Sequence, residues 1–231
     1  MKERYFIFNG INSLEKKIIL KEHPIITSPQ LRDDGIVIDG RSGKLHYDQE
    51  IYDSFVRTLE CTIIDPSIDI RNISSWLKGF GEIIFSNELD KFYKVNIVNQ
   101  IDFTNIADRI HEFPLTLEFE PFAYEITETL IELTNESGFE IRNSNTSIYP
   151  KIKVFGSGDV SLNINNQSII IYNIEDYIEL DCELELAYKD TENKNQSIYG
   201  EYLKLIPGKN EISYTGKVDK IQITYRGTYI W

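Results

Sequence analysis

The sequence predicts a mainly β protein that ends in a β-sandwich and has one α-helix in its first half. Short apolar or alternating runs, separated by turn residues, recur along the chain, which is the pattern of short β-strands. Aromatic residues make up 12% of the 231 residues, and together with abundant isoleucine they favour β-structure. Only residues 65–79 clearly space their apolar positions as a helix does.

The first half is predicted to be rich in strands. Its apolar runs predict strands at residues 5–8, 17–20, 35–38, 82–85, 92–98 and 115–119. The apolar positions of the helix are Ile70, Ile73, Trp76 and Leu77. We expect Ser67 or Asp69 to cap its start and Gly79 to end it in a left-handed conformation. Residues 105–112 form a second, less regular helix candidate that ends before Pro114.

The second half alternates more regularly between apolar and polar residues. Its predicted strands are residues 152–155, 160–164, 168–172, 177–186, 203–206, 211–214 and 218–225. Turns are expected between them at residues 156–159, 165–167, 207–210 and 215–216. In residues 177–186 the acids recur at every second position, so we expect them to face solvent in a row. Many short antiparallel strands with polar turns predict a β-sandwich.

The two halves meet near residues 122–127, after the strand at 115–119 and Pro121. We therefore expect two domains, residues 1–125 and residues 126–231. The length suits one large or two small domains, and the sequence contains no internal repeat or low-complexity segment.

The charge and the cysteines limit the functional class. The net charge of −13 disfavours nucleic-acid binding, which relies on clustered Lys and Arg. Cys61 and Cys182 lie in apolar or alternating stretches and are expected to be buried free thiols, as in a reducing compartment. The start of the chain has no signal-peptide core, and no stretch approaches a membrane span of about 20 apolar residues. We expect a soluble protein made in the cytoplasm.

Residues 35–48, GIVIDGRSGKLHYD, superficially suggest a phosphate-binding loop. The Walker pattern needs a glycine where Ile38 stands and Ser or Thr where Leu45 stands. The match fails at both positions, and a strand–turn–strand connection is favoured, with Asp39, Gly40 and Gly43 serving the backbone geometry. Arg41 and Lys44 are expected to face solvent or a neighbouring subunit.

No other pattern indicates an enzyme. The three histidines, His23, His46 and His111, have no metal-ligand spacing, and no Cys-x-x-Cys pair occurs. Ser157, between Gly156 and Gly158, lacks the surroundings of a nucleophile elbow. We expect no catalytic residues, no cofactor and no metal.

Several short motifs follow one another in an informative order. They are residues 6–10 (FIFNG), 40–45 (GRSGKL), 73–77 (ISSWL), 81–87 (GEIIFSN), 92–95 (FYKV), 117–122 (LEFEPF), 150–159 (PKIKVFGSGD), 162–166 (LNINN) and 206–212 (IPGKNEI). In this order they resemble the distal tail protein (Dit) family of phages with long, non-contractile tails, the siphophages. The motif residues are Phe8, Asn9, Gly10, Gly40, Arg41, Gly43, Trp76, Leu77, Phe85, Pro150, Gly156, Gly158, Pro207, Gly208 and Asn210.

The resemblance implies a fold and a function. It implies that residues 1–125 form a ring-forming domain like a tail-tube protein, a β-barrel or sandwich with one flanking helix, and that residues 126–231 form a galectin-like β-sandwich. It implies a structural protein of a phage or prophage, assembled in the host cytoplasm into a homo-hexameric ring at the tail tip of the virion. The implied partners are the tail tube, the tail-associated lysin or tail-tip hub, and receptor-binding or baseplate proteins, without specific nucleic-acid binding or membrane insertion.

Two other functions remain open, a carbohydrate-binding module of a virion or cell-surface adhesion apparatus and a tail-tube subunit. A tube subunit would rarely have the second sandwich. Galectins stack sugar on a tryptophan, but the only tryptophan after residue 126 is Trp231, the only arginine after residue 142 is Arg226, and no histidine occurs there. Tyr172, Tyr188, Tyr199 and Tyr202 would favour sugar binding if they clustered.

Trp76 and Leu77 have two interpretations. They could lie at a contact between neighbouring subunits, or they could hold the helix to its own domain. The second interpretation is favoured because large apolar side chains are usually buried in their own core.

Overall fold

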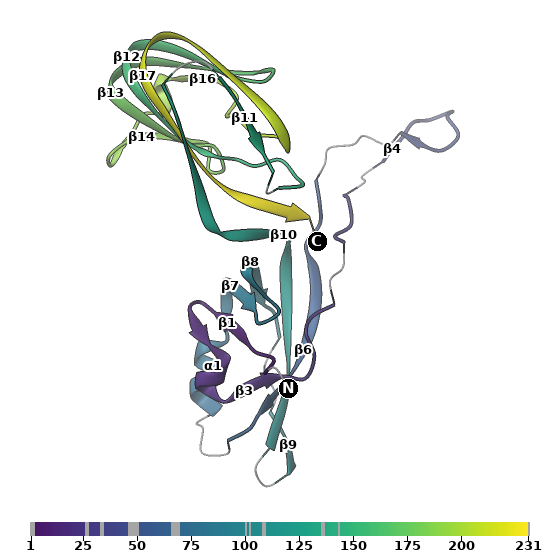
Figure 1. Cartoon of the computed structure of the whole chain (residues 1–231). Coiled ribbons are helices and arrows are strands. Elements are labelled where there is room, and N and C mark those ends of the chain that lie inside the picture. The colour runs from purple at the N-terminus through teal and green to yellow at the C-terminus, as the bar shows by residue number, and fades with distance from the viewer. Residues whose placement is uncertain are drawn as a thin grey trace. The chain divides into compact units, whose positions relative to one another are not determined.

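The computed structural model describes residues 3–25, 28–32, 35–45, 51–65, 70–99, 101, 103–107, 110–134, 137–142 and 144–230 (Figure 1). The chain divides into two compact units. The first comprises Met1–Ala123 with Ile230–Trp231, and the second comprises Tyr124–Tyr229.

The first unit contains most of the short elements. In order they are β1 (Phe6–Phe8), β2 (Ile11–Asn12), the 3-10 helix η1 (Ser13–Lys16), β3 (Ile18–Leu20), β4 (Ile36–Val37), β5 (Lys44–Leu45), β6 (Phe55–Ile63), α1 (Ile70–Trp76), β7 (Gly79–Phe85), β8 (Glu88–Ile97), β9 (Thr104–Ala107) and the first part of β10 (Ile110–Leu133).

The second unit starts within β10 and contains the longest strands. The elements that follow are β11 (Ser137–Ile141), β12 (Lys151–Ile164), β13 (Gln167–Asp181), β14 (Leu186–Lys189), β15 (Glu192–Asn193), the 3-10 helix η2 (Asn195–Ser197), β16 (Ile198–Gly200) and β17 (Gly208–Ile230). The predicted class, mainly β with one α-helix, is confirmed in the described part of the chain.

The first unit is built on a sheet that curls toward closure. Its strand order is β3–β6–β10–β8–β7–β1–β2, with β9 also paired to β10. The segment before β1 meets the end of β3, because the Leu20 N–H donates to the Arg4 carbonyl at 2.8 Å. The buried Ser13 hydroxyl accepts from the Phe6 N–H at 3.2 Å and donates to the Ile18 carbonyl at 3.0 Å. The sheet therefore encloses its apolar face in a barrel-like way.

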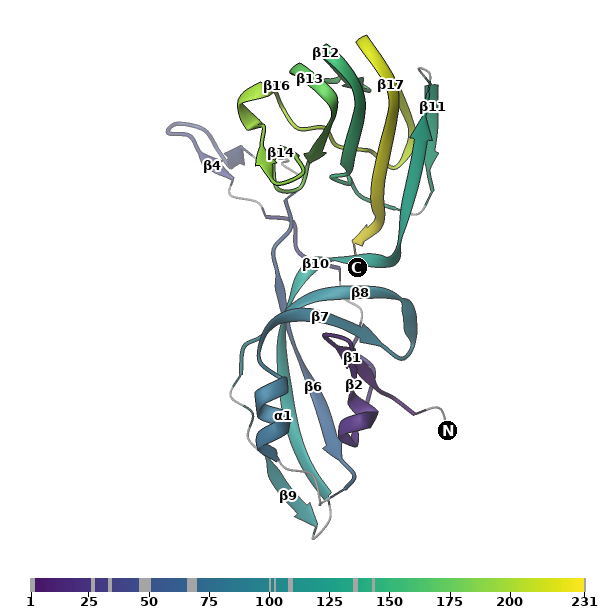
Figure 2. The same cartoon turned by 90° about the vertical axis from the view of Figure 1, so that its left-hand side faces the viewer.

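The second unit is a sandwich made from strands that bend. Strands β12 and β13 pair with each other along their length. In one half of this pair, β12 also pairs with the Lys217–Thr224 part of β17 and β13 with β14. In the other half, β12 pairs with the Ile212–Thr215 part of β17 and β13 with β16 (Figure 2). The register shifts at residues 155–161 of β12 mark the bend. Residues from both halves share one buried cluster, which places them in two facing layers.

The bend corrects two predicted turns. Residues 156–159 and 215–216 do not end their strands but lie within the continuous strands β12 and β17. Glycine is common both in turns and at bulges within strands. The glycines therefore correctly marked an irregular backbone, but its interpretation as a turn was wrong.

Other predictions also require correction. Residues 203–206 are not a strand, because only Leu205 pairs there, in an isolated bridge with Ile148. Residues 105–112 are not a helix: β9 covers Thr104–Ala107 and pairs with the start of β10. The strand predicted at 177–186 ends at Asp181, and the acids do not form one solvent-facing row, because Asp181 is buried and accepts from the Leu184 N–H at 3.1 Å. The long strand β6, which pairs with β10 from Phe55 to Ile63, was missed altogether.

Candidate functional site

The described residues do not assemble a cluster of metal-ligating side chains. Within the described ranges, no group of three His, Cys, Asp or Glu side chains could hold a metal ion. His23 and His111 lie on separate segments, and His46 lies outside the described residues. None of the helices among the described residues has the length and apolarity needed to cross a membrane.

Both cysteines are buried and unreactive in character. Burial raises the pKa of the Cys61 thiol well above its ordinary value and raises that of Cys182 to about 12. Since the thiolate is the nucleophilic form, neither side chain is suited to catalysis or exchange in the folded protein. The expected buried free thiols are confirmed.

The first motif forms a tight hairpin in the first unit. Phe8 pairs with Ile11, so Asn9 and Gly10 form a two-residue loop, and both have positive φ, 49° and 78°. This is the conformation that an Asn-Gly hairpin turn requires. The Asn9 side-chain oxygen accepts from the Glu82 N–H at 2.9 Å, which attaches the turn to β7. Asn9 and Gly10 therefore have a structural role.

Trp76 attaches α1 to its own unit. Its indole stacks on Phe6 with ring centroids 5.8 Å apart, and its Nε1–H donates to the Phe8 carbonyl at 3.2 Å. Leu77 is buried, and Phe85 is buried opposite Phe6 in the β1–β7 pair. The intra-domain interpretation of Trp76 is the one that this geometry supports.

The ends of α1 can be compared with their predicted capping residues at one end only. Gly79 has a φ of 68°, so it adopts the left-handed conformation expected after the helix. The candidate N-terminal caps, Ser67 and Asp69, lie outside the described residues.

Gly40, Arg41 and Gly43 lie in an exposed hairpin. Strands β4 and β5 form a two-stranded sheet that is separate from the main sheet, and the Arg41 N–H closes its loop on the Ile38 carbonyl at 3.1 Å. Both glycines have positive φ with open space around them. The expected strand–turn–strand structure is confirmed, and Arg41 and Lys44 are exposed.

This hairpin exposes an unusual amount of apolar surface. Ile36 and Val37 are 58% and 71% exposed, and Ile38 and Leu45 are also exposed. Single exposed aliphatic residues are normal, but a cluster on one protruding element is typical of an interaction surface. We refer to residues 35–45 as the β4–β5 hairpin.

The outer face of the first-unit sheet contains an open apolar groove of about 520 Å³. Phe80 is 82% exposed beside it. The groove is lined by Ser54, Phe80, Gly81, Glu82, Lys94, Val95, Asn96, Glu118 and Glu120. We refer to it as the Phe80 groove.

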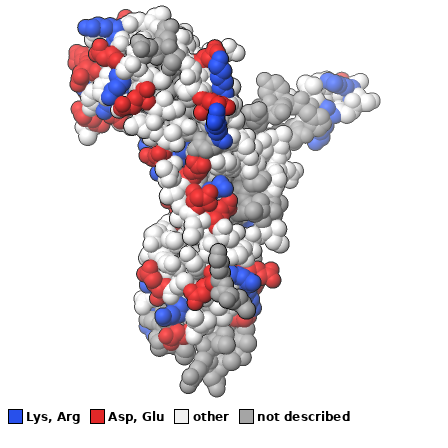
Figure 3. All heavy atoms as spheres, in the orientation of Figure 1, with Lys and Arg blue, Asp and Glu red and all other residues white. Residues whose placement is uncertain are grey.

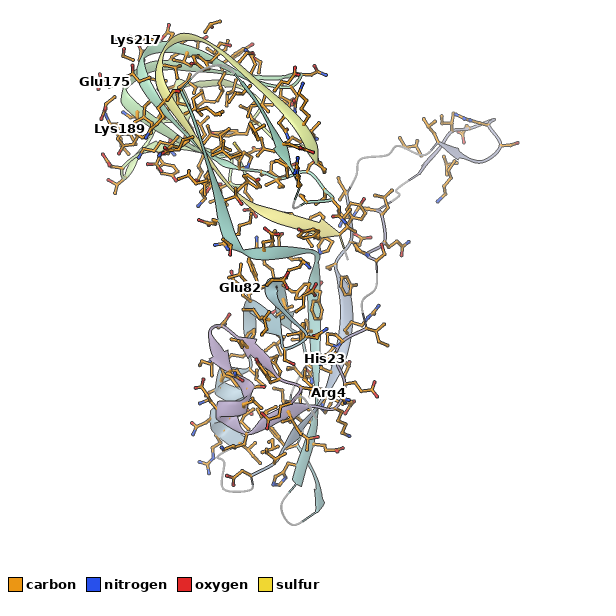
Figure 4. The ribbon with its side chains drawn as sticks, viewed as in Figure 1. Arg4, His23, Glu82, Glu175, Lys189 and Lys217 are labelled. Atoms are coloured by element: carbon orange, nitrogen blue, oxygen red, sulfur yellow. The ribbon has the colours of Figure 1, made fainter. Side chains whose placement is uncertain are left out.

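The charged residues of the Phe80 groove come from three neighbouring strands. Glu82 of β7 lies opposite Lys94 of β8, and Glu118 and Glu120 come from β10. Glu118 accepts a hydrogen bond from the Ser54 hydroxyl at 2.7 Å. Figure 4 labels Glu82 on the first unit. With three acids and one lysine, the groove is acidic at its rim and apolar along its walls.

The glycines of the second-unit motif serve the bend in β12. A Cβ on Gly156 would lie 2.2 Å from the Lys217 carbonyl oxygen, so the two strands can approach only at a glycine. Gly158 has a φ of 78° with open space around it. Pro150 is buried, and its carbonyl accepts from the Cys182 N–H at 3.1 Å. These residues position strands.

Asn210 fixes the start of β17, which begins at Gly208, directly after Pro207. Its side chain is fully buried. Its oxygen accepts from the Ile206 N–H and from the Asn165 side-chain amide, both at 3.0 Å. Its own amide group donates to the Ile206 and Gly208 carbonyls at 2.8 and 3.2 Å. The motif is therefore the entry into β17, held by one buried amide, and residues 208–210 of the predicted turn belong to this strand.

The tyrosines that could bind sugar do not form one cluster. Tyr199 of β16 lies opposite Ile170 of β13. Tyr172 comes two residues after Ile170 in β13, so it lies on the same face of the sheet as Tyr199. They are 70% and 40% exposed. Tyr188 lies on β14, at the other end of β13, and Tyr202 packs against the core. Two of the four tyrosines share a surface, and Trp231 lies outside the described residues.

Lysines occupy the other aromatic surface of the second unit. Phe155 and Tyr177 are directly opposite in β12 and β13, with centroids 5.9 Å apart. Lys153 Nζ lies 3.8 Å from the Tyr177 centroid and Lys220 Nζ lies 4.8 Å from that of Phe155. A hydrogen bond to Asp190 raises the pKa of Tyr177 to about 12. These cation–π contacts use ring faces that a sugar would need.

Salt bridges and hydrogen bonds also hold lysines of this unit. Lys153 pairs with Glu179 at 2.8 Å, and Lys189 Nζ donates to the Glu175 carbonyl at 2.5 Å. Glu175 and Lys189 appear close together in Figure 4. On the face drawn in Figure 3, acidic side chains lie over both units with Lys and Arg between them. No extended basic patch is visible on that face.

Sequence reasoning did not identify Phe80 as an exposed residue. Phe80 stands between Gly79 and Gly81 at the start of β7. An aromatic residue flanked by two glycines was the available signal, because small neighbours leave it without intrastrand packing. Whether Phe80 is exposed depends on which face of the sheet other elements cover, and this is decided by the tertiary structure.

The described residues form two β-units, a barrel-like unit with one α-helix and a sandwich of bent strands, and together they have a Dit-like fold. The chain is similar to the SPP1 Dit (gp 19.1) protein, whose crystal structure is presented as a paradigm of the hub adsorption apparatus in phages that infect Gram-positive bacteria. The TM-score is 0.76 with 12% sequence identity, and the match covers 98% of this chain and 99% of the other. No family model and no curated protein sequence matches the chain.

Proposed function

We propose that this protein is a structural component of a phage or prophage tail tip. Six copies form a ring that joins the tail tube to the tail-tip hub or tail-associated lysin and holds receptor-binding or baseplate proteins. The observation that carries the proposal is the match to SPP1 Dit over nearly the full length of both chains. A match that covers both units is more informative than a match to one common β-domain.

The surfaces of the first unit are compatible with ring assembly. A ring requires two different, complementary surfaces on each subunit. The β4–β5 hairpin and the Phe80 groove are two such distinct surfaces. In this proposal residues 1–125 form the ring and residues 126–231 form a docking sandwich.

The charge and the chemistry of the chain support a passive conduit. A ring through which DNA passes should not bind it, and a net charge of −13 per copy repels phosphate. The role is not enzymatic and needs no cofactor. The protein would be made in the host cytoplasm and would reside at the tail tip of the virion.

We expect the purified protein to form a ring of six 26.9 kDa chains at high concentration. Size exclusion with light scattering would give the mass, and negative-stain images would show the ring. A protein that stays monomeric even with its tail-lysin partner would contradict the proposal. Gene order provides an independent test, with a long tape-measure gene expected upstream and a large tail-tip gene downstream.

Carbohydrate binding is a second candidate function, favoured by one observation. Tyr172 and Tyr199 expose their rings on one face of β13 and β16, and tyrosine rings can stack on sugars. Glycan-array binding that Tyr199→Ala abolishes, while Tyr188→Ala leaves it unchanged, would support this function. The absence of binding to host cell-wall glycans would remove it.

A further inference from the structure

We propose that the β4–β5 hairpin of one copy docks in the Phe80 groove of a second copy. This contact rests on the proposed ring and names the surfaces that would join its neighbours. Both surfaces belong to the first unit, and each leaves large apolar side chains in water when the chain is alone.

The apolar surfaces have matching character. The hairpin presents a short aliphatic ridge, with Ile36 and Val37 more than half exposed. The groove presents an aromatic ring at its edge, since Phe80 is 82% exposed, and its wall is mainly apolar. An exposed aromatic anchor beside a groove is the composition found at the centre of protein interfaces.

The charges favour this pairing over contact between two hairpins or two grooves. The hairpin loop has Arg41 and Lys44 with one acid, Asp39. The groove has three acids and one lysine. Two copies of either surface would repel each other, whereas hairpin and groove attract.

The hairpin also needs a partner for physical reasons. It is a separate two-stranded sheet with two paired positions on each strand, Ile36 with Leu45 and Val37 with Lys44. An isolated two-stranded hairpin is marginally stable in water, and packing against another surface stabilises it. Because hairpin and groove are different surfaces, docking one in the other leaves a free hairpin and a free groove on the pair. Repetition of the contact produces a closed ring or a filament.

Cross-linking between two single-cysteine variants tests the contact. Ser42→Cys chains, changed in the exposed hairpin loop, and Ser54→Cys chains, changed in the lining of the groove, are mixed and treated with a short bismaleimide linker, so that no apolar or charged side chain of the contact is removed. The native cysteines should not react because both are buried. We expect a cross-linked dimer in the mixture and none when Leu130→Cys, which changes an exposed residue of the second unit, replaces Ser42→Cys.

A second measurement uses assembly. Phe80→Asp should weaken self-association about tenfold or more, because it removes the aromatic anchor and adds a fourth acid. The control is Tyr199→Asp, which changes an exposed aromatic residue that lies on the second unit. It should leave self-association unchanged. The Phe80→Asp chain should keep the wild-type unfolding midpoint, since the side chain is exposed.

The outcomes separate this contact from the proposed function. Wild-type rings that form without the Ser42–Ser54 cross-link between cysteine variants and without an effect of Phe80→Asp overturn the hairpin contact and leave the function standing. A cross-link within one chain of the double variant, in a monomer, shows that the chain's own hairpin fills the groove and also overturns it. A wild-type protein that never assembles, and shows no cross-link at high concentration, overturns both.

Discussion

Alanine at Gly156 should destabilise the second unit by about 3 kcal/mol or more. Gly156 lies where β12 passes close to β17, and an added Cβ would be 2.2 Å from the Lys217 carbonyl oxygen. That atom belongs to the backbone, so relief requires the two strands to separate and the register shift at this point to be lost. We expect a lower urea midpoint, measured by circular dichroism.

Gly158→Ala is the matched control, two residues further along the same strand. Gly158 has open space around it, but its φ of 78° is unfavourable for alanine. The expected cost is about 1–2 kcal/mol from the left-handed conformation alone. If Gly156→Ala cost no more than Gly158→Ala, the close approach of β12 and β17 would not be the reason for glycine at position 156.

The elements that could be predicted were those whose local pattern decides their structure. Asn9-Gly10 predicts a tight hairpin because both residues tolerate positive φ, and the helix at 70–76 is defined by its apolar spacing. The missed strand β6 alternates from Phe55 to Ile63 except at Val56, an exposed apolar residue, and at Arg57, which occupies an inward-phase position. The structure explains the second exception, because the Arg57 guanidinium lies 5.4 Å from the Phe55 ring centroid.

The wrong helix at 105–112 has a different cause. Its apolar residues are compatible with either period, and the pairing of β10 with β6 and β9 selects the strand. Pairing between residues far apart in sequence overrides a weak local preference. The same reason explains why the glycines at 156–158 could be located but not recognised as a bend.

The candidate site was predictable only in part. The sequence indicated an exposed turn at residues 39–44 and basic residues that face solvent or a neighbour. The Phe80 groove could not be predicted, because it is made by side chains of β7, β8 and β10 that meet only after the sheet forms. A surface that is apolar because nothing covers it has no local signature.

Removal of the Asn210 side chain should have the second large effect on stability. Asn210→Ala removes four hydrogen bonds and leaves four groups without this partner: the Ile206 N–H, the Ile206 and Gly208 carbonyls and the Asn165 side-chain amide. The expected cost is about 3 kcal/mol, since each unsatisfied buried polar group costs about 1–3 kcal/mol. Asn166→Ala is the control, because Asn166 is exposed in the neighbouring turn, and should change stability by at most about 0.5 kcal/mol.

Asn210→Asp tests the direction of the hydrogen bonds. The aspartate keeps the oxygen that accepts from Ile206 and Asn165 but replaces the donor with an oxygen that faces the carbonyls of Ile206 and Gly208. Burial should raise the pKa of this carboxyl group. Relative to wild type, the variant should therefore be least stable at neutral pH, where the group is charged. It should recover part of the lost stability in acid, where the group is protonated and can donate a hydrogen bond again. Urea midpoints of both proteins across this pH range measure the difference. A difference that is independent of pH would show that Asn210 acts through its shape rather than through its donated hydrogen bonds.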